Sequence, residues 1–240
     1  MTRASRSARG ARGWLIVAAL FAINYGMATP LAAYGVFLPI LAETFGGATL
    51  TEALADPRQW LLNVAWLVQG GLALMISVHV VPFTRDQGVP LASASLALTA
   101  YGMGSVAGRI TAGAVSDALG VRTTIGAAYL IQAVGLAALL LWPSAAARFA
   151  AIVAFGVGFA ASDTMVVKVI PDVFGLKAIG AIMGVLALGW RFGAALGPAI
   201  AGVLYDATGS YHLAFGLAPI AVLASWGCFA AATSRRRHVA

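Results

Sequence analysis

The sequence has few charged residues and almost no cysteine. Only 10% of its 240 residues are Asp, Glu, Lys or Arg, whereas a water-soluble domain carries about 25%. A single cysteine, Cys228, allows neither a disulfide within the chain nor a cysteine metal cluster. The sequence also lacks the Gly-x-Ser-x-Gly elbow of hydrolases, the His-Glu-x-x-His zinc pair and a phosphate-binding Walker loop. These absences argue against an enzyme, and the sequence predicts no metal and no cofactor.

Long apolar runs fill the chain instead. Hydrophobic residues make up 61% of it, and the mean hydropathy is +0.90. A membrane-spanning helix needs about 20 apolar residues, so this length accommodates about seven. The runs predict spans near 14–42, 60–82, 91–111, 123–142, 149–170, 178–205 and 213–233. They are continuously apolar and do not alternate in polarity, which indicates helices rather than strands. We therefore expect an all-α polytopic membrane protein.

The spans divide the chain into five expected segments. These are a basic cytoplasmic tail (1–13), an N-terminal membrane helix (14–42), a linker (43–59), a six-helix unit (60–233) and a basic C-terminal tail (234–240). In the linker, Thr49 and Glu52 have the spacing of a capping box, and Pro57 follows an Ala-Leu run. This pattern predicts a short surface helix before the six-helix unit.

The basic residues indicate topology. The net charge is +7, but the arginines gather before the first span and after the last rather than on an aromatic-rich patch, so we do not expect nucleic acid as a partner. Basic residues beside spans mark the cytoplasmic side, which places 112–122, 171–177 and the C-terminus there. The expected surroundings are the lipid bilayer of the cell's inner (plasma) membrane.

A motif that begins at the end of the third predicted span and continues into the following loop supports a family resemblance. Gly108-Arg109 is followed by Gly113-x-x-x-Asp117-x-x-Gly120-x-Arg122, which resembles the cytoplasmic loop signature of the major facilitator superfamily. Gly113 would permit close helix approach, Asp117 would pair with arginine or cap a helix, and Gly120 would let the loop turn tightly. The resemblance implies that Arg109, Gly113, Asp117, Gly120 and Arg122 form a conformational loop motif. The basic residue usual after the aspartate is replaced by Ala118.

Further segments resemble the branch that contains bacterial relatives of monocarboxylate transporters and the oxalate/formate antiporter. They are Ser162-Asp163, residues 174–177, 193–198 and 205–211, His79 to Phe83, and residues 34–39. In this comparison the chain looks like the first helix joined to helices seven to twelve, and helices two to six are missing.

The resemblance implies secondary transport of a small organic anion, monocarboxylate-like, by a shortened transporter. The alternative is a membrane remnant that does not transport, or a half-transporter that needs a homodimer or a complementing half. One crossing by 14–42 would also leave the linker outside, whereas the six-helix unit should begin inside. The sequence leaves the orientation of the first helix open.

Charged residues inside spans are candidates for transport, because each costs about 2.5–3.5 kcal/mol at the bilayer centre unless it is paired or solvated. Arg191 lies near the middle of the sixth span; we expect it to face the bundle interior and bind a carboxylate, the alternative being a packing arginine neutralised by a neighbouring helix. Asp163 is the candidate for proton or ion coupling. The alternative for Asp163 is simple pairing with Lys168.

Several uncharged polar residues complete the candidate list. His79, Tyr101, Asn24 and Tyr25 could bind substrate. His79 could equally be an interfacial histidine bonded to a carbonyl, and the other three could be packing residues. Gly184, Gly189, Gly193 and Gly197 recur at near four-residue spacing, which predicts a smooth helix face against a neighbour.

Overall fold

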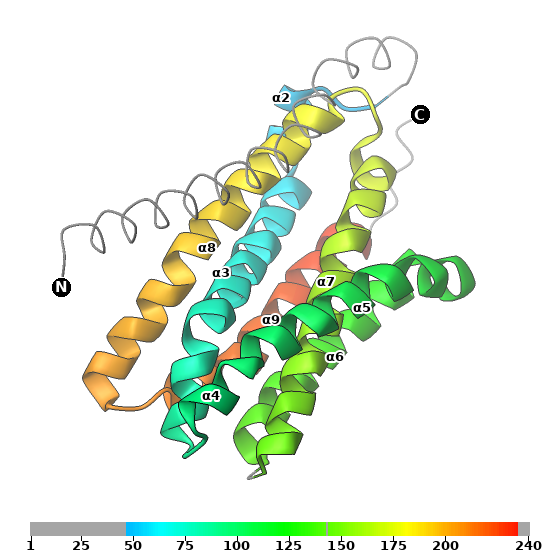
Figure 1. The fold of residues 1–240 in the computed structure, drawn as a ribbon. Coiled ribbons are helices and arrows are strands. Elements are labelled where there is room, and N and C mark those ends of the chain that lie inside the picture. The colour runs from blue at the N-terminus through cyan, green and yellow to red at the C-terminus, as the bar shows by residue number, and fades with distance from the viewer. Residues whose placement is uncertain (1–46, 143, 235–240) are drawn as a thin grey trace, which may run out of the picture.

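The computed structural model describes residues 47–142 and 144–234, and every long element in that part of the chain is a helix (Figure 1). The helices are α2 (Leu50–Ala55), α3 (Pro57–Asp86), α4 (Leu91–Ala94), α5 (Leu96–Leu119), α6 (Val121–Leu141), α7 (Ala145–Phe174), α8 (Ile179–Thr208) and α9 (His212–Ser234). The all-α prediction is confirmed. The first predicted span, with Asn24 and Tyr25, and the two basic tails lie outside the described residues.

Five helices within the described part are long and apolar enough to cross a membrane. They are α3, α6, α7, α8 and α9. The predicted span at 91–111 differs: a separate short helix, α4, follows Pro90, and α5 then runs from Leu96 to Leu119. With 24 residues, α5 is about 36 Å long and could span. Its glycines, hydroxyl residues and Arg109 make its most apolar stretch less hydrophobic than the corresponding stretches of those five helices.

The linker forms the capped helix that its sequence predicts. The Thr49 hydroxyl accepts a hydrogen bond from the Glu52 backbone N–H at 3.3 Å, and the Thr49 backbone N–H donates to Glu52 Oε2 at 2.7 Å. Pro57 then occupies the first turn of α3, where its missing N–H costs nothing. Gly47 also forms an isolated antiparallel bridge to Gly175 after α7, so this segment is attached to the six-helix unit.

Gly120 forms the entire connection between α5 and α6. Its φ of 83° lies in the left-handed region that favours glycine, so the predicted tight turn is confirmed. Gly113 is different: no atom of the described residues lies within 4 Å of where its Cβ would be. The predicted close helix approach at Gly113 is therefore wrong among the described helices, because this position is on a face of α5 that none of them covers.

Two glycine seams bring helix pairs into close contact. On α8, Gly189, Gly193 and Gly197 face Asn63, Leu67 and Gly71 of α3, and a methyl group at any of the three would overlap those neighbours. The smooth face is thus confirmed at these positions, whereas Gly184 has open space beside it. On α5, Gly104 and Gly108 face backbone carbonyls of α7 in the same way. Small residues let the helix backbones approach where no large side chain intervenes.

The six long helices of the described residues fall into two sets of three, and the main contacts run between the sets. If α3, α5 and α6 form one set and α7, α8 and α9 the other, the first helix of each set packs against the second and third helices of the other. Thus α3 contacts α8 and α9, and α7 contacts α5 and α6 (Figure 1). This is the arrangement that two three-helix repeats related by a twofold axis would produce.

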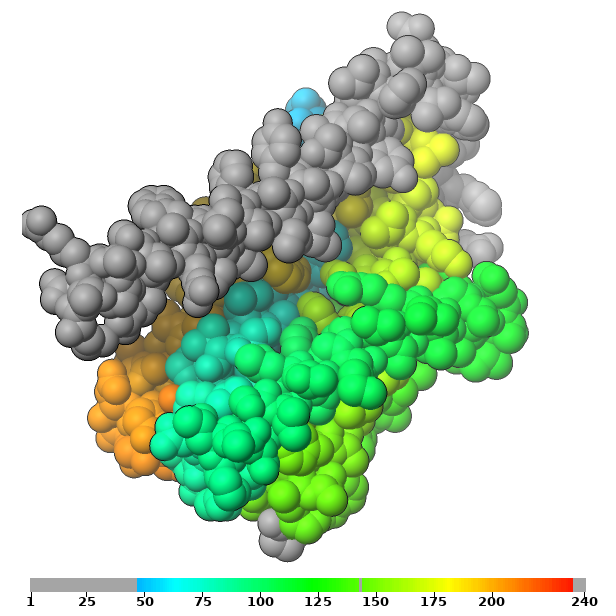
Figure 2. Space-filling model, viewed as in Figure 1, coloured from blue at the N-terminus to red at the C-terminus, as the bar shows by residue number. Residues whose placement is uncertain are grey.

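Large apolar side chains remain exposed on the outside of the bundle. On α8 they are Leu188, Phe192, Leu196, Ile200 and Val203. Figure 2 shows α3 recessed between α8 and α5. Exposed apolar area of this kind suits contact with lipid or with another helical unit rather than water.

Candidate functional site

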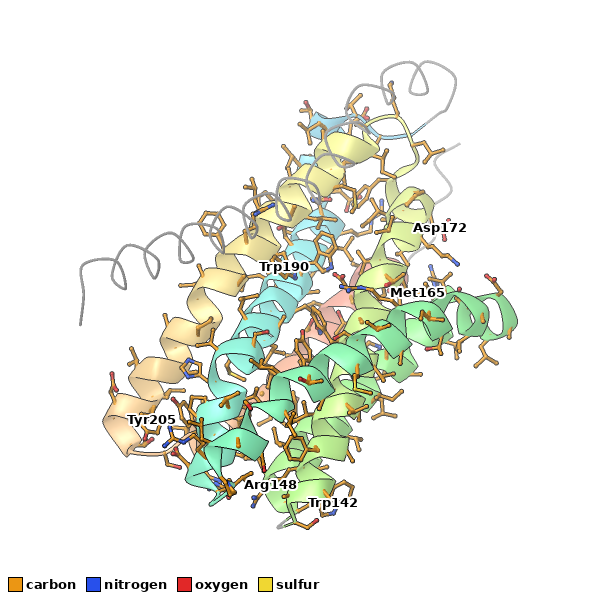
Figure 3. The ribbon with its side chains drawn as sticks, in the orientation of Figure 1. Trp142, Arg148, Met165, Asp172, Trp190 and Tyr205 are labelled. Atoms are coloured by element: carbon orange, nitrogen blue, oxygen red, sulfur yellow. The ribbon has the colours of Figure 1, made fainter. Side chains whose placement is uncertain are left out.

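Three helices bring polar residues to one depth of the bundle. Gly70 of α3 lies against the backbone oxygen of Trp190 on α8, and Figure 3 shows Trp190 between these helices. Arg191 is therefore level with the middle of α3. Gln69 on α3 shares a small pocket with Asp163 of α7, so Gln69, Asp163 and Arg191 occupy a single layer.

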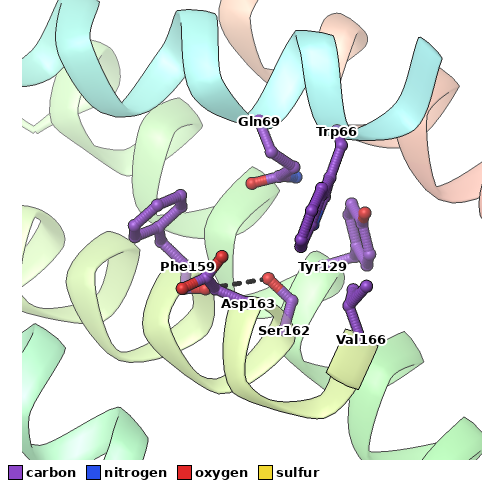
Figure 4. Close-up of a pocket in the computed structure, with 7 residues that line it drawn as sticks. All are labelled: Trp66, Gln69, Tyr129, Phe159, Ser162, Asp163 and Val166. Carbon is purple, nitrogen blue, oxygen red and sulfur yellow. Dashed lines mark hydrogen bonds between the residues drawn. The ribbon is translucent and has the colours of Figure 1, made fainter. Parts of the chain in front are cut away.

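The pocket lies where α3, α6 and α7 meet (Figure 4). Its lining residues are Trp66 and Gln69 from α3, Tyr129 from α6, and Phe159, Ser162, Asp163 and Val166 from α7. Three aromatic rings thus surround a few hydrogen-bonding groups. The gap has no room for a water molecule, so these groups face one another across a closed space in this state.

Asp163 forms an ion pair with Arg109 of α5. Its Oδ2 atom lies 3.7 Å from Arg109 Nη2, and the side chains are 33% and 55% exposed, respectively. The separation exceeds a close hydrogen bond, so the pair is loose.

Lys168 does not pair with Asp163, so that alternative is wrong. Residues five apart on a helix point about 140° away from each other. Lys168 instead donates a hydrogen bond to Ser116 Oγ at 2.9 Å and lies 3.5 Å from Asp117 Oδ1, both on α5. Asp117 is therefore paired with lysine rather than arginine. It lies in the last turn of α5 and does not cap α6, whose N-cap residue is Gly120.

The structure places Arg191 on the outside of the described helices. Its side chain is exposed, and no described carboxylate lies within 4 Å of it. The expectation that these helices would enclose Arg191 is not met, because Gly189 and Gly193 face α3 and a residue two positions from each points to the opposite side of α8. Arg122 is also exposed, at the start of α6.

Tyr101 lies beside the pocket, whereas His79 does not. The Tyr101 ring stacks on Phe155 at 5.8 Å and contacts Phe159, a pocket residue, at 6.3 Å between ring centroids. His79 is ten residues beyond Gln69 on α3, about 15 Å along the helix. Its Nε2 lies 3.0 Å from the carbonyl oxygen of Pro198, and its Nδ1 lies 3.1 Å from the Tyr211 hydroxyl. These contacts agree with the carbonyl-bonded histidine considered as the alternative.

Sequence reasoning missed the buried amides. Gln69 is 3% exposed, and its Oε1 has no hydrogen-bond partner among the described residues, whereas its side chain also interacts with the Tyr129 hydroxyl. Gln132 donates from Nε2 to Ser162 Oγ at 3.1 Å, while its Oε1 lacks a partner. An amide in an apolar span is the signal that could have identified both, since burying an unpaired amide is costly. Within the described ranges no three His, Cys, Asp or Glu residues gather as a metal site would require.

Comparisons with known proteins agree with this architecture. The profile of the Major Facilitator Superfamily matches residues 14–240. An uncharacterized MFS-type transporter of Escherichia coli (strain K12), YhjX, is 31% identical over 151 residues, covering 60% of this chain and 37% of that protein. Monocarboxylate transporter 12 of Xenopus laevis is 32% identical over 175 residues, covering 71% of this chain and 38% of that protein.

A solved structure has the same fold. The crystal structure of the MFS transporter FucP in the outward conformation matches with a TM-score of 0.63 at 13% sequence identity, over 77% of this chain and 45% of FucP. The matched region thus spans less than half the length of FucP and of both relatives.

Proposed function

Because the chain belongs to the major facilitator superfamily, we propose that it takes part in secondary transport of a small organic anion of the monocarboxylate class. The membrane would be the cell's inner (plasma) membrane. Family membership and the multi-pass helical architecture favour transport over catalysis.

The polar layer at mid-depth of the helices carries this proposal. Arg191 and Arg109 place two guanidinium groups near the depth of Asp163 and Gln69. A guanidinium binds a carboxylate through two parallel hydrogen bonds, which fixes orientation as well as charge. Arg191 has no carboxylate within 4 Å among the described residues, so its charge is available to an anionic substrate.

Asp163 offers a way to couple substrate to a proton. The charged carboxylate holds Arg109 in a loose ion pair. Protonation of Asp163 would cancel that attraction and leave Arg109 to attract an anion. A carboxylate substrate and a proton would then bind together, as symport requires.

The names of the relatives support the substrate class. The Xenopus laevis relative and another from Danio rerio, which is 27% identical over 204 residues and covers 76% of this chain, are named monocarboxylate transporters. We propose the same substrate class, monocarboxylates, for this chain. Substrate size would be set by groups around the polar layer, including Tyr101 and Phe159.

A complete pathway requires a second half. Transporters of this type bind substrate between two halves, and this chain matches less than half the length of its relatives. We therefore place a second copy or a complementing half against the exposed faces of α5 and α8. The alternative function, a membrane unit that does not transport, would leave those faces to lipid alone.

Uptake of labelled carboxylates by proteoliposomes tests the proposal. The full chain should accumulate at least one short monocarboxylate in response to an inward proton gradient. Arg191→Lys should reduce uptake because ammonium lacks the planar fork of guanidinium, and Arg191→Ala should reduce it further. Arg85→Lys, a conservative change at an exposed arginine in the last turn of α3, outside the polar layer and the loop motif, is the matched control. Unchanged uptake by Arg191→Ala would remove Arg191 from the site.

A further inference from the structure

The pocket between α3 and α7 contains hydrogen-bonding capacity that the described residues leave unused. The side chain of Gln69 points from α3 into the pocket, whose opposite wall carries Asp163 (Figure 4). Gln69 is almost completely buried, and its Oε1 has no hydrogen-bond partner among the described residues, whereas its side chain also interacts with the Tyr129 hydroxyl. Buried amides are nearly always paired, so Oε1 of Gln69 has spare capacity to accept a hydrogen bond in this pocket.

The hydroxyl groups of the pocket already have partners. Ser162 donates to the backbone oxygen of Phe159 at 2.9 Å and accepts from Gln132. The Tyr129 hydroxyl lies 3.3 Å from Ser225 Oγ. These bonds connect α6, α7 and α9 within the bundle. The unmatched Oε1 atom of Gln69 therefore faces a wall on which Asp163 is the one titratable carboxyl group.

The two sides of Asp163 offer different chemistry. Arg109 is a donor only, so it suits the charged carboxylate. A protonated carboxyl group has an O–H that must find an acceptor, and the guanidinium has none to offer. The Oε1 atom of Gln69 is an unmatched acceptor inside the same pocket.

The geometry points to Gln69 as the hydrogen-bond acceptor that holds protonated Asp163 directly, once Asp163 has released Arg109. This inference rests on the proposed function and deepens it. One proton from solvent adds to a carboxylate oxygen of Asp163, no other covalent bond changes, and Arg109 keeps its charge. Gln69 acts through Asp163, so it is a positioning residue rather than a substrate contact.

Infrared spectroscopy of the full chain in lipid, recorded as a function of pH, tests this role. Protonation of Asp163 adds a carboxylic-acid C=O band, which Asp163→Asn identifies by removing it. Gln69→Leu should move that band to higher frequency, because the acid loses its hydrogen-bond partner. The band should also appear about one pH unit lower, a tenfold weaker proton affinity, the size of one hydrogen bond. Gln69→Met keeps the side-chain length and replaces Gln69→Leu if that variant does not fold.

Asn63→Leu is the matched control. Asn63 is another buried amide of α3 with an unpartnered Nδ2, but it does not line the pocket. This variant should leave the Asp163 band unchanged. The inference is overturned if neither Gln69 variant moves the band, if Asn63→Leu moves it equally, or if the wild-type chain shows no such band while folded.

The infrared measurement of Asp163 against pH does not depend on transport activity. If the wild-type chain shows the carboxylic-acid band of Asp163 but takes up no carboxylate, the result counts against the proposed function. The role of Gln69 would still stand, because the band reports protonation of Asp163 and not transport.

Discussion

The Nε2 atom of His79 lies 3.0 Å from the carbonyl oxygen of Pro198, and this contact ties α3 to the middle of α8. A carbonyl oxygen can only accept, so Nε2 carries the proton. The Nδ1 atom meets the Tyr211 hydroxyl, which can donate or accept. The histidine therefore serves as a structural link from α3 to α8 and to the residue that precedes α9.

We expect His79→Ala to destabilise the protein by about 1–3 kcal/mol, since a part-buried carbonyl and a hydroxyl both lose their partner. Thermal unfolding in detergent would measure the effect. Tyr211→Phe removes only the second contact and should cost less. Equal melting temperatures for the wild-type chain and His79→Ala would show that the contact does not stabilise the fold.

The α3 to α8 seam gives a sharper stability test. Gly193→Ala should destabilise the bundle by about 1–3 kcal/mol or more, because the new methyl group would overlap the backbone of Leu67. Gly184→Ala on the same helix has open space beside it. That control should be neutral or stabilising by up to about 1 kcal/mol, since alanine favours helix. Similar losses from both substitutions would contradict the seam.

The contact between Lys168 and Asp117 should matter little for stability. Asp117 is 80% exposed and Lys168 is 45% exposed, and surface ion pairs contribute about 0–1 kcal/mol. Lys168→Gln should therefore change the free energy of unfolding by less than about 1 kcal/mol, with the difference shrinking at high salt. Measurement at two salt concentrations, beside Asp117→Asn, separates the ion pair from the hydrogen bond to Ser116. A loss of several kcal/mol would mean that this contact is essential to the fold.

Cross-linking can identify what covers α8. After Cys228→Ser, cysteine would be introduced at Phe192 on α8 or at Leu130 on α6, both strongly exposed. If a second copy completes the pathway, Phe192→Cys should form disulfide-linked dimers in membranes and Leu130→Cys should not. Dimers from both positions would indicate random collision. A monomer that transports carboxylates at a saturable rate would contradict the need for a second half.

The helical nature of the chain and most helix positions were predictable from the sequence. Apolar length is a local property, so continuous runs identified α3, α6, α7, α8 and α9 to within several residues. The capping box at Thr49 and the turn at Gly120 were also predictable, because a cap and a left-handed residue depend on a few neighbouring positions.

The composition of the polar site depended on packing between distant segments. Sequence position suggested Lys168 as a partner of Asp163, but helix rotation turns Lys168 towards Asp117 and leaves Asp163 to Arg109. An amide in an apolar span draws attention to Gln69, but its position opposite Asp163 depends on how α3 and α7 pack.

The sequence by itself determined that this chain is a multi-helix membrane protein, because low charge and long apolar runs leave no other stable arrangement of the backbone in lipid. It also determined the polar residues that the apolar helices must accommodate. Only the tertiary structure decided which face each residue occupies. Glycine seams set how closely the helices approach and how they are rotated, and that rotation placed Gln69 opposite Asp163 while directing Arg191 outwards.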